Sequence, residues 1–281
     1  MSLKRAVVSG VRAMGRMPPL SLVLSYPNVR RRFQSLPGFR TIYGRGWDLI
    51  HPFDTLNGTD TSGYIPSEKL LDRPPSGAKP QPYAGSQPSI VRTAFGELPP
   101  LSNFTFIDLG AGKGRPLMVA FEFPFKEVIG VELSPALVNL ARKNLATFRR
   151  QHPDCAPSRM ENVDAAVFPF PAGDLVIFLY NSLGKEVMTR VVANIEAALS
   201  TGPRSLFIIY YNPVYGACFD ASPSLRRYYA GTIPYAAGER GFGPDDADPV
   251  VIWQGRSTLS AKAGADATIR ITVPGMRCEL T

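Results

Sequence analysis

The fold of this chain is decided by one stretch, Phe106-Ile107-Asp108-Leu109-Gly110-Ala111-Gly112-Lys113-Gly114-Arg115. An apolar run that starts at Phe104 leads into three glycines at alternate positions, and Pro116 and further apolar residues follow. This pattern predicts a buried strand, a tight turn and a helix, because glycine permits positive φ angles and proline suits the first turn of a helix. In open α/β sheets, ligands bind at the carboxyl ends of the strands. The stretch therefore predicts a ligand-binding turn.

The sequence after this stretch repeats the alternation of strand and helix. The predicted strands cover residues 104–109, 128–133, 158–163, 175–180 and 205–211, and the predicted helices cover 90–98, 135–148 and 187–199. Two closing strands, 249–253 and 267–273, predict an antiparallel edge. We therefore expect an α/β fold with a Rossmann-like, mostly parallel sheet and helices on both faces.

The part of the chain before this pattern predicts an irregular extension. It contains prolines at positions 18, 19, 27 and 37 and a proline-rich loop over residues 74–88. We place the extension at residues 1–82 and the ligand-binding domain at residues 83–281. The glycine-bracketed segment 53–64 is a candidate lid, with Asp54 or Asp60 contacting substrate, or a plain turn capped by Asp and Thr.

Positive charge is concentrated at the beginning of the chain. Residues 1–47 contain no Asp or Glu and hold nine basic side chains: Lys4, Arg5, Arg12, Arg16, Arg30, Arg31, Arg32, Arg40 and Arg45. The rest of the chain is close to neutral, although the whole chain has a net charge of +8. The segment is interpreted as a solvated extension, as a contact surface for nucleic acid, anionic lipid or an acidic protein, or as an organelle transit peptide.

Other residue types exclude several kinds of site. The two histidines, His51 and His152, are too few for a multi-histidine metal site, and the three cysteines are widely separated. We therefore expect no metal site and no disulfide. No apolar run is long enough to span a bilayer, so we expect a cytoplasmic protein without a transmembrane helix.

Acidic residues at the ends of three predicted strands indicate the ligand. A dinucleotide fingerprint has the pattern Gly-x-Gly-x-x-Gly, whereas here the third glycine comes one residue early and Asp108 precedes the turn. A carboxylate there repels a pyrophosphate and favours the ammonium and sulfonium charges of S-adenosylmethionine. Glu132 is placed to accept hydrogen bonds from ribose hydroxyls. Alternatively, its negative charge stabilises the start of the following helix. Asp164 is placed to accept from the adenine amino group, with loop capping as the alternative.

These motifs resemble the successive cofactor motifs of class I S-adenosylmethionine-dependent methyltransferases. The resemblance rests on the stretch 108–115, on Gly130-Val131-Glu132-Leu133-Ser134, on Ala141 with Asn144, and on Asp164-Ala165, and it covers about residues 83–215. It implies a seven-stranded sheet whose last strand is antiparallel and in-line methyl transfer from the sulfonium. The cofactor residues that it implies are Asp108, Gly110, Gly112, Gly114, Glu132, Asp164 and Ala165.

A narrower resemblance concerns lysine methyltransferases of this fold that lack a SET domain. It rests on Tyr83 ahead of a helix and on Tyr180-Asn181-Ser182-Leu183-Gly184 ahead of a longer helix. It implies that Asn181 lies beside the transferring methyl and that Tyr83 contacts the methionine end of the cofactor. Those enzymes usually carry Asn-Asn-Phe or Asn-Pro-Phe where this chain has Asn181-Ser182-Leu183.

The catalytic candidates follow from these positions. An amide oxygen of Asn181 could orient an incoming nitrogen, and the ring of Tyr180 could contact a cation, unless such tyrosines are core residues. We therefore expect a methyltransferase with a protein lysine as acceptor. The alternatives are a small-molecule methyltransferase, a nicotinamide oxidoreductase, and a non-catalytic nucleic-acid-binding protein on the same scaffold.

Overall fold

A computed structural model describes most of the chain after the basic segment. The described residues are 46, 49–70, 81–202, 204–243, 245–255, 259–273 and 276–281. The nine basic residues of segment 1–47 and residues 74–80 of the proline-rich loop lie outside them. The interpretations of segment 1–47 therefore stay predictions.

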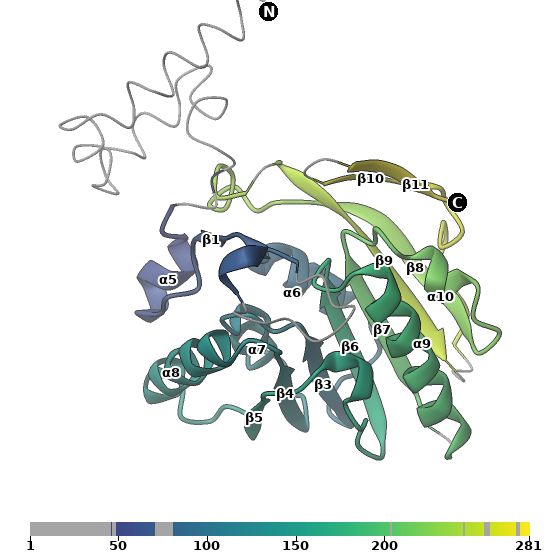
Figure 1. The fold of residues 1–281 in the computed structure, drawn as a ribbon, viewed down its shortest axis with the longest axis horizontal. Coiled ribbons are helices and arrows are strands. Elements are labelled where there is room, and N and C mark those ends of the chain that lie inside the picture. The colour runs from purple at the N-terminus through teal and green to yellow at the C-terminus, as the bar shows by residue number, and fades with distance from the viewer. Residues whose placement is uncertain are drawn as a thin grey trace, which may run out of the picture.

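A seven-stranded sheet forms the centre of the molecule (Figure 1). Its strands are β3 (Phe104–Leu109), β4 (Glu127–Val131), β5 (Ser158–Glu161), β6 (Asp174–Tyr180), β7 (Leu206–Tyr211), β8 (Leu225–Pro234) and β9 (Ala247–Gly255). Their spatial order is β5-β4-β3-β6-β7-β9-β8, and within this sheet β9 runs antiparallel to both of its neighbours. This arrangement confirms the predicted Rossmann-like, mostly parallel sheet with an antiparallel element toward one end.

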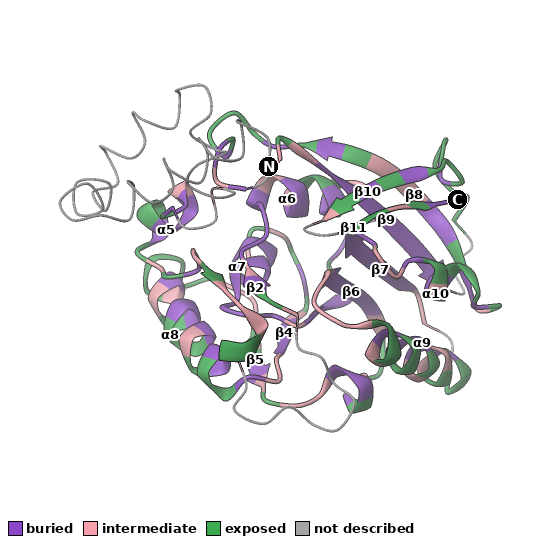
Figure 2. Cartoon of the chain, turned by 45° about the horizontal axis from the view of Figure 1, so that its top comes forward, coloured by how far each residue is buried: buried purple, intermediate pink, exposed green. Residues whose placement is uncertain are grey.

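Helices cover both faces of this sheet, as Figure 1 shows. One face packs against α6 (Pro88–Gly96), α7 (Arg115–Ala120) and α8 (Pro135–Gln151), and the other packs against α9 (Lys185–Ser200) and the short α10 (Ala217–Asp220). The central strands β3, β6 and β7 are buried on both sides, whereas α8 and α9 expose one polar face each (Figure 2). This two-sided burial explains why β3, β6 and β7 consist mainly of apolar residues.

Two features near the end of the chain differ from the prediction. The predicted strand 267–273 does not join the main sheet; as β10 (Ile269–Val273) it forms a separate antiparallel hairpin with β11 (Met276–Leu280). The edge strand β8 was not predicted, because its residues include two arginines, a glycine and a proline instead of an apolar run. Its pairing partner β9 supplies the hydrogen bonds that hold it extended.

Residues 49–70 pack against the sheet domain. They contain α5 (Pro52–Asn57), β1 (Tyr64–Ile65) and the 3-10 turn η1 (Ser67–Lys69), and β1 pairs with β2 (Tyr83–Ala84). His51 caps α5: its Nδ1 atom accepts a hydrogen bond from the backbone N–H of Phe53. The segment contacts the glycine turn, where the candidate site is built.

Candidate active site

The glycine stretch forms a tight turn on which neighbouring side chains leave no room for a Cβ atom. Gly110 and Gly112 have φ angles of 83° and 54°. A Cβ atom on Gly110 would come within 2.3 Å of the Ser182 side chain, and one on Gly112 would come within 2.4 Å of the Tyr83 ring. Gly114 differs from these two, because it is the N-cap of α7 and packs against Ala141.

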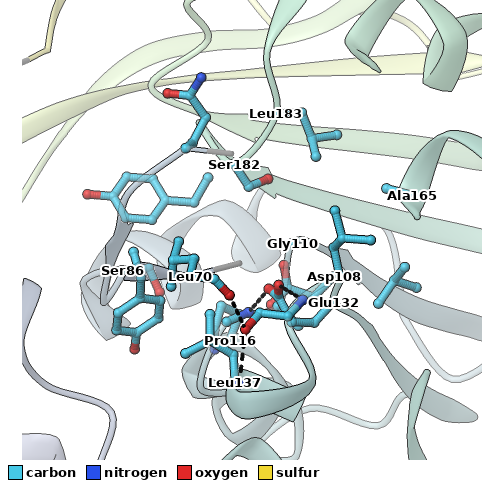
Figure 3. Close-up of a pocket in the computed structure, with 18 of the residues that line it drawn as sticks. Leu70, Ser86, Asp108, Gly110, Pro116, Glu132, Leu137, Ala165, Ser182 and Leu183 are labelled. Atoms are coloured by element: carbon cyan, nitrogen blue, oxygen red, sulfur yellow. Dashed lines mark hydrogen bonds between the residues drawn. The ribbon is translucent and has the colours of Figure 1, made fainter. Parts of the chain in front are cut away.

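A cavity lies directly on this turn at the carboxyl ends of the strands (Figure 3). Its wall combines side chains from the N-terminal segment, the glycine turn and the loops after β4, β5 and β6. Eight of the residues predicted for the site line it: Tyr83, Asp108, Gly110, Gly112, Glu132, Asp164, Ala165 and Tyr180. Of the predicted residues, Gly114 and Asn181 are not among the described residues that line the cavity, so their predicted roles stay predictions.

Asp108 faces the cavity with an unpaired oxygen. The residue is 2% exposed, and its Oδ2 atom has no hydrogen-bond partner among the described residues. Burial raises the pKa of this carboxyl well above its ordinary value, and the nearby Glu132 carboxylate raises it further. A buried acceptor without a partner is costly, so this oxygen is suited to a cationic ligand that enters the cavity.

Glu132 follows β4 and connects the glycine turn to the start of α8. Its carboxylate accepts hydrogen bonds from the backbone N–H groups of Gly112 and Ser134, at 2.9 and 2.8 Å. Burial raises the pKa of Glu132, and these donated bonds oppose that rise. The backbone N–H of Leu133 also lowers this pKa. A carboxylate offers about four acceptor positions, so acceptor capacity stays available for a hydroxyl donor in the cavity.

Asp164 lies farther along the same edge of the sheet and caps the 3-10 turn η2 (Ala165–Val167). Its Oδ1 atom accepts from the backbone N–H of Ala166 at 2.9 Å, and its Oδ2 atom lies 3.9 Å from Nη1 of Arg190. Asp164 therefore makes the capping contact that the alternative interpretation predicted. Because Asp164 also lines the cavity, contact with an adenine amino group stays a prediction.

Tyr83 closes the cavity from the side of the N-terminal segment. Its ring packs on Gly112, its hydroxyl donates to the carbonyl oxygen of Thr61 at 2.6 Å, and the Nζ atom of Lys113 lies 5.5 Å from the ring centre. Burial raises the pKa of the Tyr83 hydroxyl, which therefore stays neutral. The ring is a fixed wall beside the turn.

The two carboxylates of the candidate lid hold that segment in place. Asp54 is buried, accepts hydrogen bonds from Thr61 and Ser62, and pairs with Arg115 at 3.6 Å. Asp60 pairs with the Nζ atom of Lys113 at 3.0 Å. Neither carboxylate belongs to the described lining of the cavity. These contacts support the capped turn rather than an acidic contact with substrate.

The loop after β6 forms the opposite wall of the cavity. The Tyr180 ring stacks on the Tyr211 ring, with centres 4.1 Å apart. Asn181 has a φ of 41°, and the next residue, Ser182, lines the cavity and donates its hydroxyl to the carbonyl oxygen of Leu109 at 2.6 Å. The sequence therefore indicated a loop that lines the cavity but did not single out Ser182 within it.

Further lining residues were not predicted, and Arg115, Leu70 and Ser86 are three examples. Arg115 belongs to the glycine stretch itself, and its position there was a usable signal. Leu70 and Ser86 lie outside the motifs, and no spacing in the sequence indicates them (Figure 3). Ser86 is 3% exposed, and its hydroxyl has no partner among the described residues.

Two other kinds of site are absent from the described part of the chain. The described residues contain no cluster of three or more His, Cys, Asp or Glu side chains that could hold a metal ion. They also contain no helix that is both long and apolar enough to cross a membrane.

Comparison with known proteins shows similarity to solved methyltransferase structures. No protein-family model matches the chain, and no curated protein matches it. The 23S rRNA methyltransferase ErmE is 14% identical, with 64% of this chain and 73% of that chain covered and a TM-score of 0.43. An rRNA methylase from Streptococcus thermophilus is 11% identical, with 61% and 98% covered and a TM-score of 0.40. A SAM-dependent methyltransferase from Leishmania major is 14% identical, with 58% and 68% covered and a TM-score of 0.41.

Proposed function

We propose that this protein is an S-adenosylmethionine-dependent methyltransferase that binds its cofactor in the cavity on the glycine turn. One observation carries the proposal: the Oδ2 atom of Asp108 is buried, lines the cavity and has no partner among the described residues. S-adenosylmethionine supplies two positive charges, an ammonium and a sulfonium, and either would compensate this carboxylate.

The other lining residues fit the remaining parts of that cofactor. Glu132 would accept from a ribose hydroxyl, Asp164 and Ala165 would hold an adenine edge, and Tyr83 would contact the methionine end. Gly110 and Gly112 keep the turn free of Cβ atoms, so the ligand can approach the backbone. Hydroxyl and amine donors therefore find acceptors on this wall.

A nicotinamide dinucleotide fits this site less well. Its pyrophosphate would approach Asp108 and Glu132, two carboxylates that face the cavity. The two cations of the glycine stretch, Lys113 and Arg115, are already paired with Asp60 and Asp54. The turn therefore presents acceptors to the ligand rather than free positive charge, which favours the cationic cofactor.

The residues of the chain would act mainly by placing the reactants. The cofactor supplies an activated methyl group, and transfer requires an acceptor held in line with it, so proximity provides much of the rate. Tyr180 and Ser182 form the wall at the end of β6, where we propose that the acceptor enters. Asn181, which follows Tyr180, is our proposed contact for an acceptor nitrogen, although in this structure it lies outside the lining.

The acceptor in this proposal is a nitrogen, and the class that we favour is the side chain of a protein lysine. The stacked rings of Tyr180 and Tyr211 support it, because aromatic faces stabilise cationic and amine groups. Small molecules and RNA are the alternative acceptors. The basic segment within residues 1–47 supports contact with nucleic acid or anionic lipid, which would weaken steeply with added salt.

We also propose a division of the chain into an extension, residues 1–82, and a methyltransferase domain, residues 83–281. Residues 49–70 of the extension complete the wall of the cavity, because Leu70 lines it and Thr61 accepts the hydroxyl of Tyr83. The extension would therefore contribute to cofactor binding in its second half.

Two measurements test the proposal. Calorimetric titration should show binding of S-adenosylhomocysteine and no binding of NADH, and the bound ligand should raise the melting temperature. A flat response to S-adenosylhomocysteine at millimolar concentration would refute the cofactor assignment. Labelled S-adenosylmethionine incubated with host lysate should then place label on protein, and label confined to RNA or small metabolites would refute the lysine acceptor.

A further inference from the structure

A buried carboxylate lies behind the wall that Tyr180 and Ser182 form at the end of β6. No sequence motif indicates it. Asp248 belongs to β9, and its side chain is 2% exposed. Because β9 runs antiparallel to β7, the first residues of β9 lie beside the carboxyl ends of β6 and β7 (Figure 1). The backbone N–H of Asn212 donates to the carbonyl oxygen of Pro249, which fixes Asp248 beside the end of β7.

Asp248 collects three donors from neighbouring segments. The Tyr211 hydroxyl donates to Oδ2 at 2.7 Å, the Tyr235 hydroxyl donates to the same oxygen, and the Nδ2 atom of Asn212 lies 3.3 Å from Oδ1. Burial raises the pKa of Asp248, and these three hydrogen bonds oppose that rise. A carboxylate with this number of partners is held in one orientation.

This carboxylate is connected to the cavity through two stacked rings. Tyr211 is fully buried and bonds to Asp248 through its hydroxyl, while its ring centre lies 4.1 Å from the Tyr180 ring centre. Tyr180 in turn lines the cavity. Burial raises the pKa of the Tyr180 hydroxyl, and the charge of Asp248 adds to that rise. A hydrogen bond with Tyr211 opposes the rise of this pKa, and so does the Arg115 guanidinium, which is paired with Asp54.

The arrangement places the Tyr180 ring at the cavity, with the Tyr211 ring and the Asp248 carboxylate behind it. Such a wall stabilises a positive charge in front of it, because the ring quadrupole and the carboxylate act in the same direction. A phosphate in front of the same wall would be repelled. An amine acceptor becomes a cation as it receives a methyl group, so this wall favours the charge that develops during that transfer.

We propose that Asp248 is a positioning residue that holds Tyr180 through Tyr211 and makes the acceptor end of the cavity selective for cationic, amine-type groups. The inference rests on the proposed function, since it concerns the acceptor side of the same cavity. It predicts that a positive charge at the transfer position is bound more tightly because Asp248 is present.

Two cofactor analogues test this without a known substrate. S-adenosylhomocysteine lacks the methyl group of the cofactor. Sinefungin instead carries a carbon with an ammonium group at the position of the sulfonium and its methyl group. Calorimetry on the full chain should show that Asp248→Asn weakens the binding of sinefungin by about tenfold. This is the size expected for the loss of one charge interaction in a partly buried site. The same variant should bind S-adenosylhomocysteine within about twofold of the wild-type affinity. Tyr211→Phe keeps the stacked ring but removes its hydrogen bond to Asp248. This variant should lower the affinity for sinefungin relative to that for S-adenosylhomocysteine, by a smaller factor than Asp248→Asn does.

A matched control separates this effect from loss of stability. Asp220 is another carboxylate that bonds side chains of β8 and β9, Arg227 and Trp253, but it does not belong to the described lining of the cavity. Asp220→Asn should lower the melting temperature and leave the ratio of the two affinities unchanged.

The outcomes are distinguishable. If the wild-type chain binds neither analogue, the proposed function fails. If it binds both and Asp248→Asn leaves their ratio unchanged, the role of Asp248 is overturned while the cofactor assignment stands. If Asp248→Asn does not fold, an unchanged ratio in Tyr211→Phe overturns the inference and a lowered ratio supports it.

Discussion

The Oδ2 atom of Asp54 lies 3.6 Å from the Nη2 atom of Arg115, and this buried ion pair joins the N-terminal segment to the glycine turn. The side chains are 1% and 3% exposed. Arg115 also donates to the hydroxyl of Thr61 and to the carbonyl oxygen of Ser86. One guanidinium therefore links the N-terminal segment, the loop at Ser86 and the glycine turn.

Replacing Asp54 by Asn should destabilise the protein by about 3–5 kcal/mol, because it leaves the Arg115 charge buried without its partner. Urea unfolding measures the loss. Asp60→Asn is the matched control: its partner Lys113 belongs to the same turn, but the Asp60 side chain is 70% exposed, so the expected loss is about 1 kcal/mol or less. Equal losses in the two variants would contradict the structural role of Asp54.

Truncation should separate the two halves of the extension. Deleting residues 1–47 should leave binding of S-adenosylhomocysteine unchanged, because the described contacts to the cavity begin after them. Deleting residues 1–70 should reduce that affinity at least tenfold, since it removes Leu70 from the lining and the pairing partner of β2. Calorimetry on both proteins, with circular dichroism to check folding, decides it. Full affinity after the longer deletion would show that the segment is not part of the site.

Cofactor affinity should rise with pH through the titration of Asp108. Burial and the Glu132 charge raise the pKa of Asp108, so at low pH the carboxyl is neutral and must lose its proton to face a cation. Binding of S-adenosylmethionine should therefore release a proton, which calorimetry in buffers of different ionisation enthalpy measures. Asp108→Asn should abolish the proton release and weaken binding more than Asp164→Ala does. Equal losses, or proton release that survives Asp108→Asn, would contradict the assignment.

Stability should fall as the pH drops below the ordinary range of histidine. Burial, together with the charge of Arg115, lowers the pKa of His51 to about 3. The unfolded chain, with a pKa of about 6.5, therefore binds a proton that the folded chain excludes between these values. This group adds a slope of about 1.4 kcal/mol per pH unit, with stability complete above pH 6.5 and lost toward pH 3. His51→Asn keeps an N-cap acceptor and should flatten that part of the curve in urea unfolding. An unchanged slope would show that His51 is not the group responsible.

Local patterns in the sequence were sufficient for the elements on which the site is built. The strand predicted over residues 104–109 is β3, and the helix predicted after Ser134 begins there, with Ser134 as its N-cap. These predictions succeeded because a strand buried on both faces requires a continuous apolar run, and a helix start requires a local acceptor. Asp108, Glu132 and Tyr180 were located for the same reason: each lies in or next to such an element.

Tertiary structure decided the partners that these residues have. The pairing of Asp54 with Arg115, the position of Asp248 behind Tyr211 and the extended strand β8 all depend on residues far apart in the chain. Hydrophobic periodicity reports which side of an element is buried, but it carries no information about which distant side chain meets it. A buried charge is costly without a partner close to it, and that pairing is fixed by the packing of the whole chain.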